Sequence, residues 1–325
     1  MAIKIIGIIF VILISIIVVF LLILTIIHRI KLSFEQDKIT PIGQIVEVND
    51  HNMHVYLEGE HASYDSPLLV FLGGSGDPFP VFTFRPLYVK LSDDYRIAVV
   101  ERAGFGYSEK TDQPRDIDTI LSETREALRL VGETGPYIIF PHSMAGIEAL
   151  RWAQMYPNEV LGIAGVDMAV PMELDHVSKL LLRLTSIINF TGVHRLFGIG
   201  AMNSIVDLSA IEADMTEHEK EQMRLLFNRN YFQNESREGP PLINNIRLVK
   251  ESGIPDVPMI LFFSNEFELI GTKPGTWFEL KYRFSLEHNA PLIRLDAGHL
   301  LMSEEPEILA QHSREFIATI LHKRE

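Results

Sequence analysis

A serine at a predicted strand-to-helix corner most constrains the fold of this chain. Ser143 follows an apolar run at 137–140 that is typical of a buried strand, and it precedes a helical pattern at 147–156 that ends before Pro157. At such a corner the hydroxyl projects from the end of a sheet, and the free N–H groups of the following helix can stabilise negative charge. The sequence therefore predicts that Ser143 is a nucleophile.

A serine hydroxyl becomes reactive when a base removes its proton and a carboxylate orients that base. His299 is the predicted base. It follows the short apolar segment 292–295 and Gly298, and it comes after Ser143 in the chain, which is the order expected for this motif. Most of the 12 histidines are expected at the surface or in ordinary hydrogen bonds, so this context is what distinguishes His299.

The developing oxyanion needs fixed hydrogen-bond donors. A buried strand is predicted at 68–72, and it is followed by a glycine-rich turn at 73–76. Glycine lets the backbone approach a ligand closely, whereas this turn is too short for a phosphate loop and lacks its lysine. We predict that the backbone N–H groups of Ser75 and Met144 form the oxyanion hole, with Gly74 providing room.

These segments, together with Arg-Ala-Gly-Phe-Gly-Tyr-Ser at 102–108, resemble the α/β-hydrolase superfamily over residues 42–325. The resemblance implies a mainly parallel sheet with helices on both faces, a Ser-Asp/Glu-His triad, and acyl-transfer chemistry without a metal or organic cofactor. Two positions depart from the common Gly-x-Ser-x-Gly elbow, because Pro141 and Ala145 replace its glycines. A serine nucleophile, rather than an aspartate, argues against the epoxide-hydrolase and dehalogenase branches.

The acid of the triad has three candidates. The resemblance usually places it after the seventh strand, predicted at 259–263, where Glu266 and Glu268 flank the expected position and no aspartate occurs. A second location in the superfamily follows the sixth strand, predicted at 162–166, and there the next residue is Asp167. Asp167 is the first choice and the two glutamates are alternatives, because the chemistry requires only a carboxylate within hydrogen-bond reach of the imidazole.

The N-terminus predicts a single-pass anchor in the cell membrane. Residues 5–27 carry no charge, and about 20 apolar residues span a bilayer. No small-residue cleavage pattern follows, so we expect an uncleaved anchor over 1–32 and a polar tether over 33–41. Lys4 precedes the span whereas Arg29 and Lys31 follow it, which favours a cytoplasmic catalytic domain. Signal anchors with short N-terminal tails often export that domain instead, so both orientations stay open.

The remaining chain divides into a core at 42–171 and 256–325 and a helical cap at 172–255, inserted between strands six and seven. Segments 42–48 and 53–58 predict a hairpin, and 116–131 predicts an amphipathic helix packed on the sheet. The strongly apolar cap segment 177–199 has two interpretations. It is either a buried core helix or a lid wall or surface that leans on the membrane.

The composition of the chain limits the classes of ligand and binding site that it could have. The net charge of −14 argues against nucleic acid, and the absence of cysteine excludes disulfides and thiolate metal sites. The sequence therefore predicts a membrane-anchored serine hydrolase that cleaves an ester or related acyl bond in a small-molecule or lipid-like substrate. Three alternatives stay open: an acyltransferase, a binding protein on a hydrolase fold, and an aminopeptidase-like peptidase whose cap carboxylate binds a free amine, with the candidates Glu212, Asp214 and Glu217.

Overall fold

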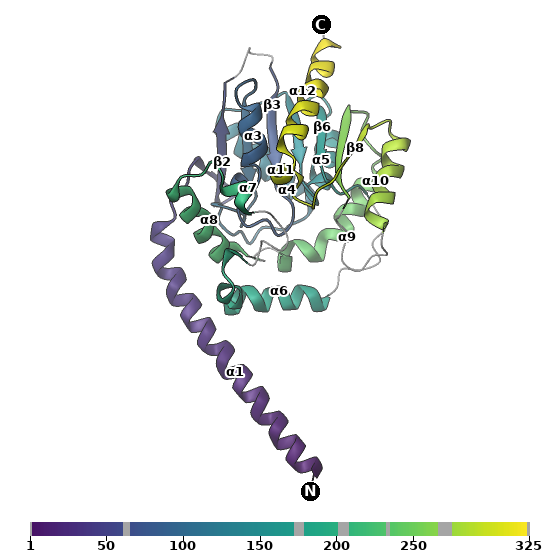
Figure 1. Ribbon diagram of the computed structural model, residues 1–325. Coiled ribbons are helices and arrows are strands. Elements are labelled where there is room, and N and C mark those ends of the chain that lie inside the picture. Colours follow the sequence, from purple (N-terminus) through teal and green to yellow (C-terminus); the bar gives the residue numbers. More distant parts are fainter. Residues whose placement is uncertain are drawn as a thin grey trace.

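An eight-stranded sheet forms the centre of the computed structural model (Figure 1), which describes residues 2–60, 66–171, 179–200, 208–231, 235–265 and 275–323. The strand order is β1-β2-β4-β3-β5-β6-β7-β8. Strand β2 pairs antiparallel with β1 and β4, and the remaining neighbours pair in parallel. The strands are β1 (Gln44–Val48), β2 (His51–Glu58), β3 (Leu68–Leu72), β4 (Ile97–Glu101), β5 (Tyr137–Pro141), β6 (Val160–Val166), β7 (Met259–Ser264) and β8 (Leu292–Leu295).

The hairpin of β1 and β2 turns more tightly than its sequence suggests. The connection contains only Asn49 and Asp50, with φ angles of 47° and 65°, and β2 already begins at His51. Two residues with positive φ are what a tight hairpin turn requires, and Asn and Asp tolerate that conformation. The predicted strands leave residues 49–52 as the loop, and this prediction is wrong for residues 51 and 52, which belong to β2.

Helices cover both faces of the sheet and bury one apolar cluster on each face. Every residue of β3, β4 and β5 is buried, as expected for parallel strands between two helical layers. The predicted α/β fold is thereby confirmed. The helices of the core are α2 (Pro80–Thr83), α3 (Arg85–Leu91), α4 (Ile117–Leu130), α5 (Ala145–Met155), α10 (Thr276–Glu287), α11 (Leu301–Glu304) and α12 (Pro306–His322).

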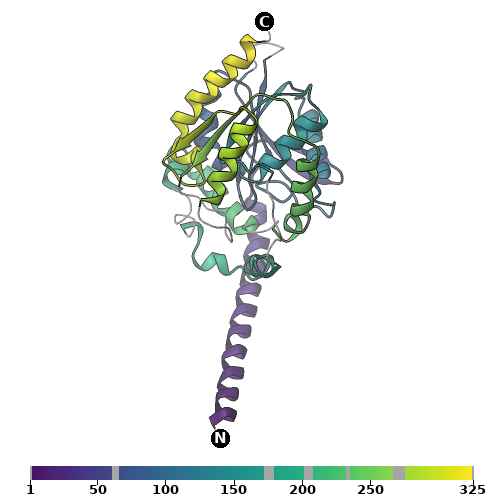
Figure 2. The same ribbon diagram turned by 90° about the vertical axis from the view of Figure 1, so that its right-hand side faces the viewer.

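The N-terminal helix α1 (Ala2–Glu35) projects away from the sheet (Figure 2). Its apolar segment has a mean hydropathy of 3.6 and none of it is buried, so the helix is long and apolar enough to cross a membrane. The predicted tether begins as helix, because α1 continues to Glu35 and a 3₁₀ turn follows at Gln36–Lys38. The amide of Gln222 in the cap donates to the carbonyl of Lys38, at 2.9 Å, which holds this segment against the cap.

The segment between β6 and β7 contributes further helices: α6 (Lys179–Thr191), the 3₁₀ turn η2 (Val193–Leu196), α7 (Leu208–Glu212), α8 (Glu217–Asn230) and α9 (Glu235–Glu251). Helix α6 lies on the side of the domain toward which α1 extends (Figure 1). Its interpretation as a buried core helix is wrong, because Leu180 is 68% exposed and Phe190 is 57% exposed. Packing against α1 and α9 covers only part of its surface.

Candidate active site

Ser143 occupies a strained corner between β5 and α5. Its φ is 51°, a left-handed conformation that residues other than glycine seldom adopt and that recurs at functional sites. The amide of Ala169, beyond the end of β6, donates to the Ser143 carbonyl at 2.7 Å and ties the corner down. Pro141 ends β5 in parallel register with Leu72, so the missing glycine of the elbow does not prevent the corner from forming.

Small residues allow close packing around this corner. A Cβ atom at Gly74 would lie 2.7 Å from the Ser143 Cβ, and one at Gly146 would collide with the Ala169 carbonyl. The backbone of the glycine-rich turn therefore lies directly against Ser143. Within the described residues, the backbone N–H groups of Ser75 and Met144 have no hydrogen-bond partner, so both are available to a ligand.

Asp167 and His299 meet at the same end of the sheet, although 132 residues separate them. The His299 Nδ1 lies 2.5 Å from the Asp167 Oδ2, so the buried carboxylate accepts a hydrogen bond from the imidazole. That bond places the ring hydrogen on Nδ1 and leaves Nε2 as the basic nitrogen. Asp167 directly follows β6, and His299 follows β8, so both come from the carboxyl ends of parallel strands.

His142 connects Ser143 to the loop of His299. Its ring centroid lies 4.5 Å from that of His299, and its Nε2 lies 3.1 Å from the His299 carbonyl, to which it donates. Burial and then the neighbouring His299 lower the pKa of His142 to about 3, so its ring is neutral. Ser143, His142, Asp167 and His299 therefore form one continuous group at the end of the sheet.

Three further side chains hold the Asp167 carboxylate. Ser264 Oγ donates to Oδ2 at 2.9 Å, Trp277 Nε1 donates to Oδ1 at 3.1 Å, and the Lys281 ammonium pairs with Oδ1. Burial by itself would raise the pKa of Asp167, but the charge of Lys281 and the hydrogen bond from His299 outweigh it and hold the pKa well below its usual range. The carboxylate is therefore ionised and fixed in orientation.

Lys281 is itself buried, at 2% side-chain exposure, and its ammonium lies 4.1 Å from the centre of the Trp277 ring. Burial lowers the pKa of Lys281 to about 8, and Asp167 limits that decrease. Sequence reasoning missed Lys281 and Trp277, because α10 carries no motif that relates it to Asp167. Ser264 and His142 had weak signals, since Ser264 directly follows the strand predicted at 259–263 and His142 directly precedes Ser143.

The other predicted site residues lie apart from this group. Glu266 and Glu268 fall outside the described residues. In the cap, the Glu217 side chain is 85% exposed and pairs with Lys220, and Asp214 is exposed. Glu212 is partly buried at the end of α7. No contact in the described chain brings these three carboxylates to Ser143, so the structure gives the peptidase alternative no support of its own.

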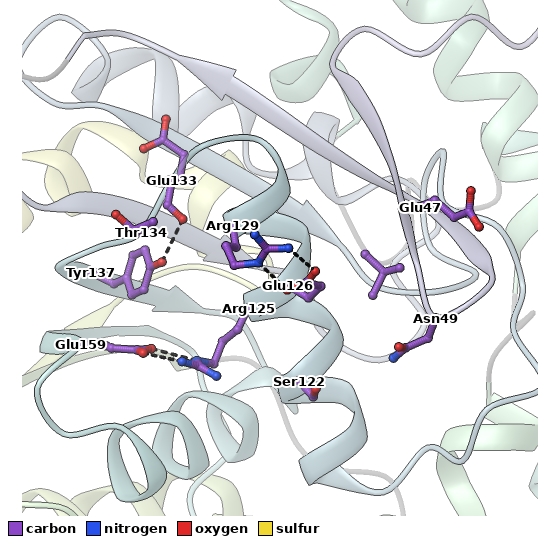
Figure 3. Close-up of a pocket in the computed structure, with 11 residues that line it drawn as sticks. Glu47, Asn49, Ser122, Arg125, Glu126, Arg129, Glu133, Thr134, Tyr137 and Glu159 are labelled. Carbon is purple, nitrogen blue, oxygen red and sulfur yellow. Dashed lines mark hydrogen bonds and ion pairs between the residues drawn. The ribbon is translucent and has the colours of Figure 1, made fainter.

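A cavity of about 430 Å³ lies at the opposite end of the sheet (Figure 3). Its lining includes Tyr137 at the start of β5 and Glu159 just before β6, whereas Ser143 and Asp167 follow the ends of these strands. Both arginines of its lining are paired with carboxylates of the same lining, Arg125 with Glu159 and Arg129 with Glu126. This cavity is therefore separate from the candidate active site. Among the described residues, no cluster of His, Asp and Glu side chains could hold a metal ion.

No family model matches the chain. Among curated proteins, the chain is 36% identical over 210 residues to the uncharacterized protein YbdG of Bacillus subtilis, an alignment that covers 63% of the chain and 62% of that relative. The chain thus spans about three fifths of that relative's length. It is 24% identical over 120 residues to a 2-(acetamidomethylene)succinate hydrolase of Mesorhizobium japonicum, covering 37% of the chain and 42% of that enzyme.

Solved structures share the fold over most of the chain. Cfl2 from Burkholderia cenocepacia matches with a TM-score of 0.65 and 18% identity, covering 84% of this chain and 95% of Cfl2. A protein inferred to be an ancestral haloalkane dehalogenase matches with a TM-score of 0.59 and 20% identity, covering 86% of this chain and 99% of that protein. At these identities the likeness concerns the fold alone.

Proposed function

Because this chain has the α/β-hydrolase fold, we propose that it is a membrane-anchored serine hydrolase that cleaves an ester or related acyl bond. The observation that carries this proposal is the hydrogen bond from His299 to the buried Asp167, formed beside the strained corner of Ser143. A carboxylate that orients an imidazole next to a serine is the arrangement that activates a hydroxyl. The resemblance of the elbow and the Gly-His turn to the superfamily supports the same assignment.

The chemistry follows from the position of each group. The Ser143 hydroxyl attacks the substrate carbonyl while His299 Nε2 takes its proton, and Asp167 stabilises the imidazolium that forms. The N–H groups of Ser75 and Met144 receive the oxyanion. When the tetrahedral intermediate collapses, His299 returns the proton to the leaving alcohol and an acyl-enzyme remains. Water then attacks the acyl-enzyme while His299 again takes a proton and returns it. This second step releases the carboxylic acid and restores the Ser143 hydroxyl.

Serine at the nucleophile position separates this proposal from the activity of a haloalkane dehalogenase. Aspartate is the nucleophile that the resemblance implies for that branch, and its carboxylate forms an alkyl ester with the substrate. Position 143 offers a hydroxyl instead, which suits acyl transfer. The exposed apolar helix α1 supports membrane anchoring, because an unburied helix of this hydropathy is stable in lipid and costly in water.

A fluorophosphonate probe tests the proposed nucleophile. We expect the folded full-length protein to form one covalent adduct, located on Ser143 by mass spectrometry of its peptides, and to lose this reactivity on heat unfolding. Ser75→Ala is the matched control, because the proposed role of Ser75 uses its backbone, and this variant should label like the unchanged protein. An adduct on a different residue, or none, would contradict the assignment.

The Lys281–Asp167 pair leads to a second prediction, which concerns how kcat depends on pH. Lys281 is charged below its pKa of about 8, and its charge opposes the formation of an imidazolium beside Asp167. Loss of that proton leaves the Asp167 charge fully available to stabilise the imidazolium. We expect kcat to rise by roughly tenfold as the pH increases through about 8. A tenfold change in rate corresponds to about 1.4 kcal/mol of charge interaction between Lys281 and the imidazolium.

Lys281→Arg is the decisive variant for this pH effect, because a guanidinium keeps its charge throughout the range. We expect kcat of Lys281→Arg to reach a plateau below pH 8 and to show no rise as the pH increases through 8. Steady-state hydrolysis of a p-nitrophenyl ester, corrected for the uncatalysed rate at each pH, measures both profiles. Identical profiles for the two proteins would show that Lys281 does not influence the reaction.

A further inference from the structure

A second cavity, of about 230 Å³, lies where α1 meets the domain. It is distinct from the group around Ser143, and four parts of the chain form it: the end of α1, helix α6, helix α8 and the loop after β4. Three of its lining residues are cations, on α1, in the loop and on α8. The full lining is His28, Arg29, Leu32, Ser108, Glu109, Lys110, Asn189 and Arg229.

Among the described residues, none of the three cations of this cavity forms an ion pair, although the charges of Glu101 and Glu109 act on Arg229. No carboxylate in the described chain lies within ion-pair distance of Arg29, Lys110 or Arg229, and the one acidic lining residue, Glu109, accepts a hydrogen bond from the Asn52 amide at 3.0 Å. Such a cluster is unusual in a protein of net charge −14, where carboxylates outnumber basic side chains. An anion is therefore the complementary ligand.

The mutual repulsion of these groups is visible at Lys110. Its side chain reaches solvent at the rim of the cavity, yet partial desolvation, followed by the charges of Arg29, Arg229 and Arg237, lowers its pKa. Arg237 pairs with Asp112, whereas the other cations face the cavity without a carboxylate partner in the described chain. Bringing an anion into the cavity would relieve this repulsion.

The cavity lies at the level where α1 leaves its apolar segment. Arg29 lies two residues after Ile27, where the apolar run ends, and basic residues at such a junction lie among lipid headgroups. Arg195 of the cap fixes this level, because its guanidinium makes two hydrogen bonds to Glu35, at 2.8 and 2.6 Å, and one to His28, at 2.7 Å. These contacts join the segment between β6 and β7 to the end of α1.

Helix α6 presents apolar side chains on the same side of the domain. Figure 2 shows α6 end-on beside α1, on the side toward which α1 extends. Leu180, Leu184, Ile187 and Phe190 recur at helical spacing, and between 47% and 68% of each is exposed. The Arg29 guanidinium lies 5.1 Å from the centre of the Phe190 ring, so the apolar stripe and the basic cavity adjoin. Apolar side chains beside cations suit the boundary between acyl chains and headgroups.

We propose that this cavity binds the phosphate of an anionic phospholipid headgroup, whose acyl chains lie against α1 and the apolar stripe of α6. This inference rests on the membrane anchoring proposed above. The cavity has the volume of about eight liquid waters, at ~30 Å³ each, which is enough for a phosphate with a small polar head. The bound lipid would join α1, the cap and the loop after β4, and would thereby fix the cap relative to the bilayer.

Lipid selectivity of the full-length protein in detergent tests the proposal. The protein is mixed with equal amounts of phosphatidylglycerol and phosphatidylcholine, and native mass spectrometry counts the lipid that each molecule retains. We expect one phosphatidylglycerol to be retained in preference. Lys110→Gln should weaken its retention about tenfold, the factor for loss of one charge-assisted contact, and Arg29→Gln with Lys110→Gln should weaken it further.

Two control variants isolate the charge at this site. Lys110→Arg keeps the charge in the cavity and should keep the preference. Lys323→Gln removes a lysine from the exposed C-terminal end of α12, far from α1 (Figure 1), and should also keep it. Equal retention of the two lipids by the unchanged protein, or an unaltered preference in Lys110→Gln, would overturn the proposal. Displacement of the lipid by glycerol phosphate at the same concentration would also overturn it, because the site would then recognise a free anion.

Two further measurements distinguish an error in the lipid-binding proposal from an error in the proposed hydrolase function. Resistance to alkaline carbonate extraction measures membrane anchoring, and fluorophosphonate labelling of Ser143 measures the active site, each in the same preparations. Lipid selectivity without labelling would leave the cavity assignment standing and reject the hydrolase. Labelling and anchoring without lipid selectivity would reject only the cavity assignment.

Discussion

Ser143→Ala is expected to reduce kcat for ester hydrolysis by about 10⁶-fold. The methyl group of alanine cannot attack a carbonyl, so the acyl-enzyme cannot form. A residual rate of ~10³–10⁴-fold over water can remain, because the backbone donors beside Gly74 still bind the oxyanion. Steady-state hydrolysis of a p-nitrophenyl ester by the full-length protein in detergent measures the loss.

Folding must be separated from catalysis in this experiment. Ser143 has a φ of 51°, so alanine at this position carries the same backbone strain, and its thermal unfolding should change little. Ser75→Ala should keep a rate close to that of the unchanged protein. A Ser143→Ala protein that unfolds normally and keeps more than ~1% of the activity would show that a different group performs the attack.

Asp167→Asn is expected to reduce kcat by about 10⁴-fold. The asparagine amide would present an N–H or a weaker acceptor to His299 Nδ1, so the ring would lose both its tautomer and the charge that stabilises the imidazolium. The change also removes the partner of Lys281, which would leave a buried ammonium without its counter-charge. We therefore expect a lower melting temperature together with the loss of activity.

Asp296→Asn provides the matched control, because this aspartate is exposed in the loop after β8 and accepts a hydrogen bond from the Asn265 side chain. It should retain both activity and stability. If Asp167→Asn stays within tenfold of the unchanged kcat, a different carboxylate orients His299, and the glutamates at 266 and 268 become the candidates. The double variant Asp167→Asn with Lys281→Met separates the two effects, since it should recover stability without recovering activity.

Much of the core was predictable because its signals are local. The apolar run of β5, the corner at Ser143 and the helix that follows lie within about 20 consecutive residues, and each depends on neighbouring side chains. Helix α4 starts at its predicted place because the Asp116 side chain accepts the Thr119 amide, at 3.0 Å. Helix α12 begins at Pro306, and proline suits the first turn of a helix.

Pairings between distant segments depended on the folded chain. The resemblance ranked Asp167 above Glu266 and Glu268, but only the parallel pairing of β6, β7 and β8 brings Asp167 to His299. Lys281 and Trp277 approach the same carboxylate from α10, which no local pattern connects to β6. Hydrogen bonds of this kind depend on distances of about 3 Å, which residue order does not contain.

By itself, the sequence determined the alternation of strands and helices, the corner at Ser143 and the apolar N-terminal helix, since each follows from hydrophobic periodicity and backbone preference over a few turns of chain. The tertiary structure decided which carboxylate meets the imidazole, which side of α6 is exposed, and which cations share a cavity beside α1. The physical reason is that burial and charge pairing depend on what packs against a residue. For these residues, the partners lie more than 100 positions away in the chain.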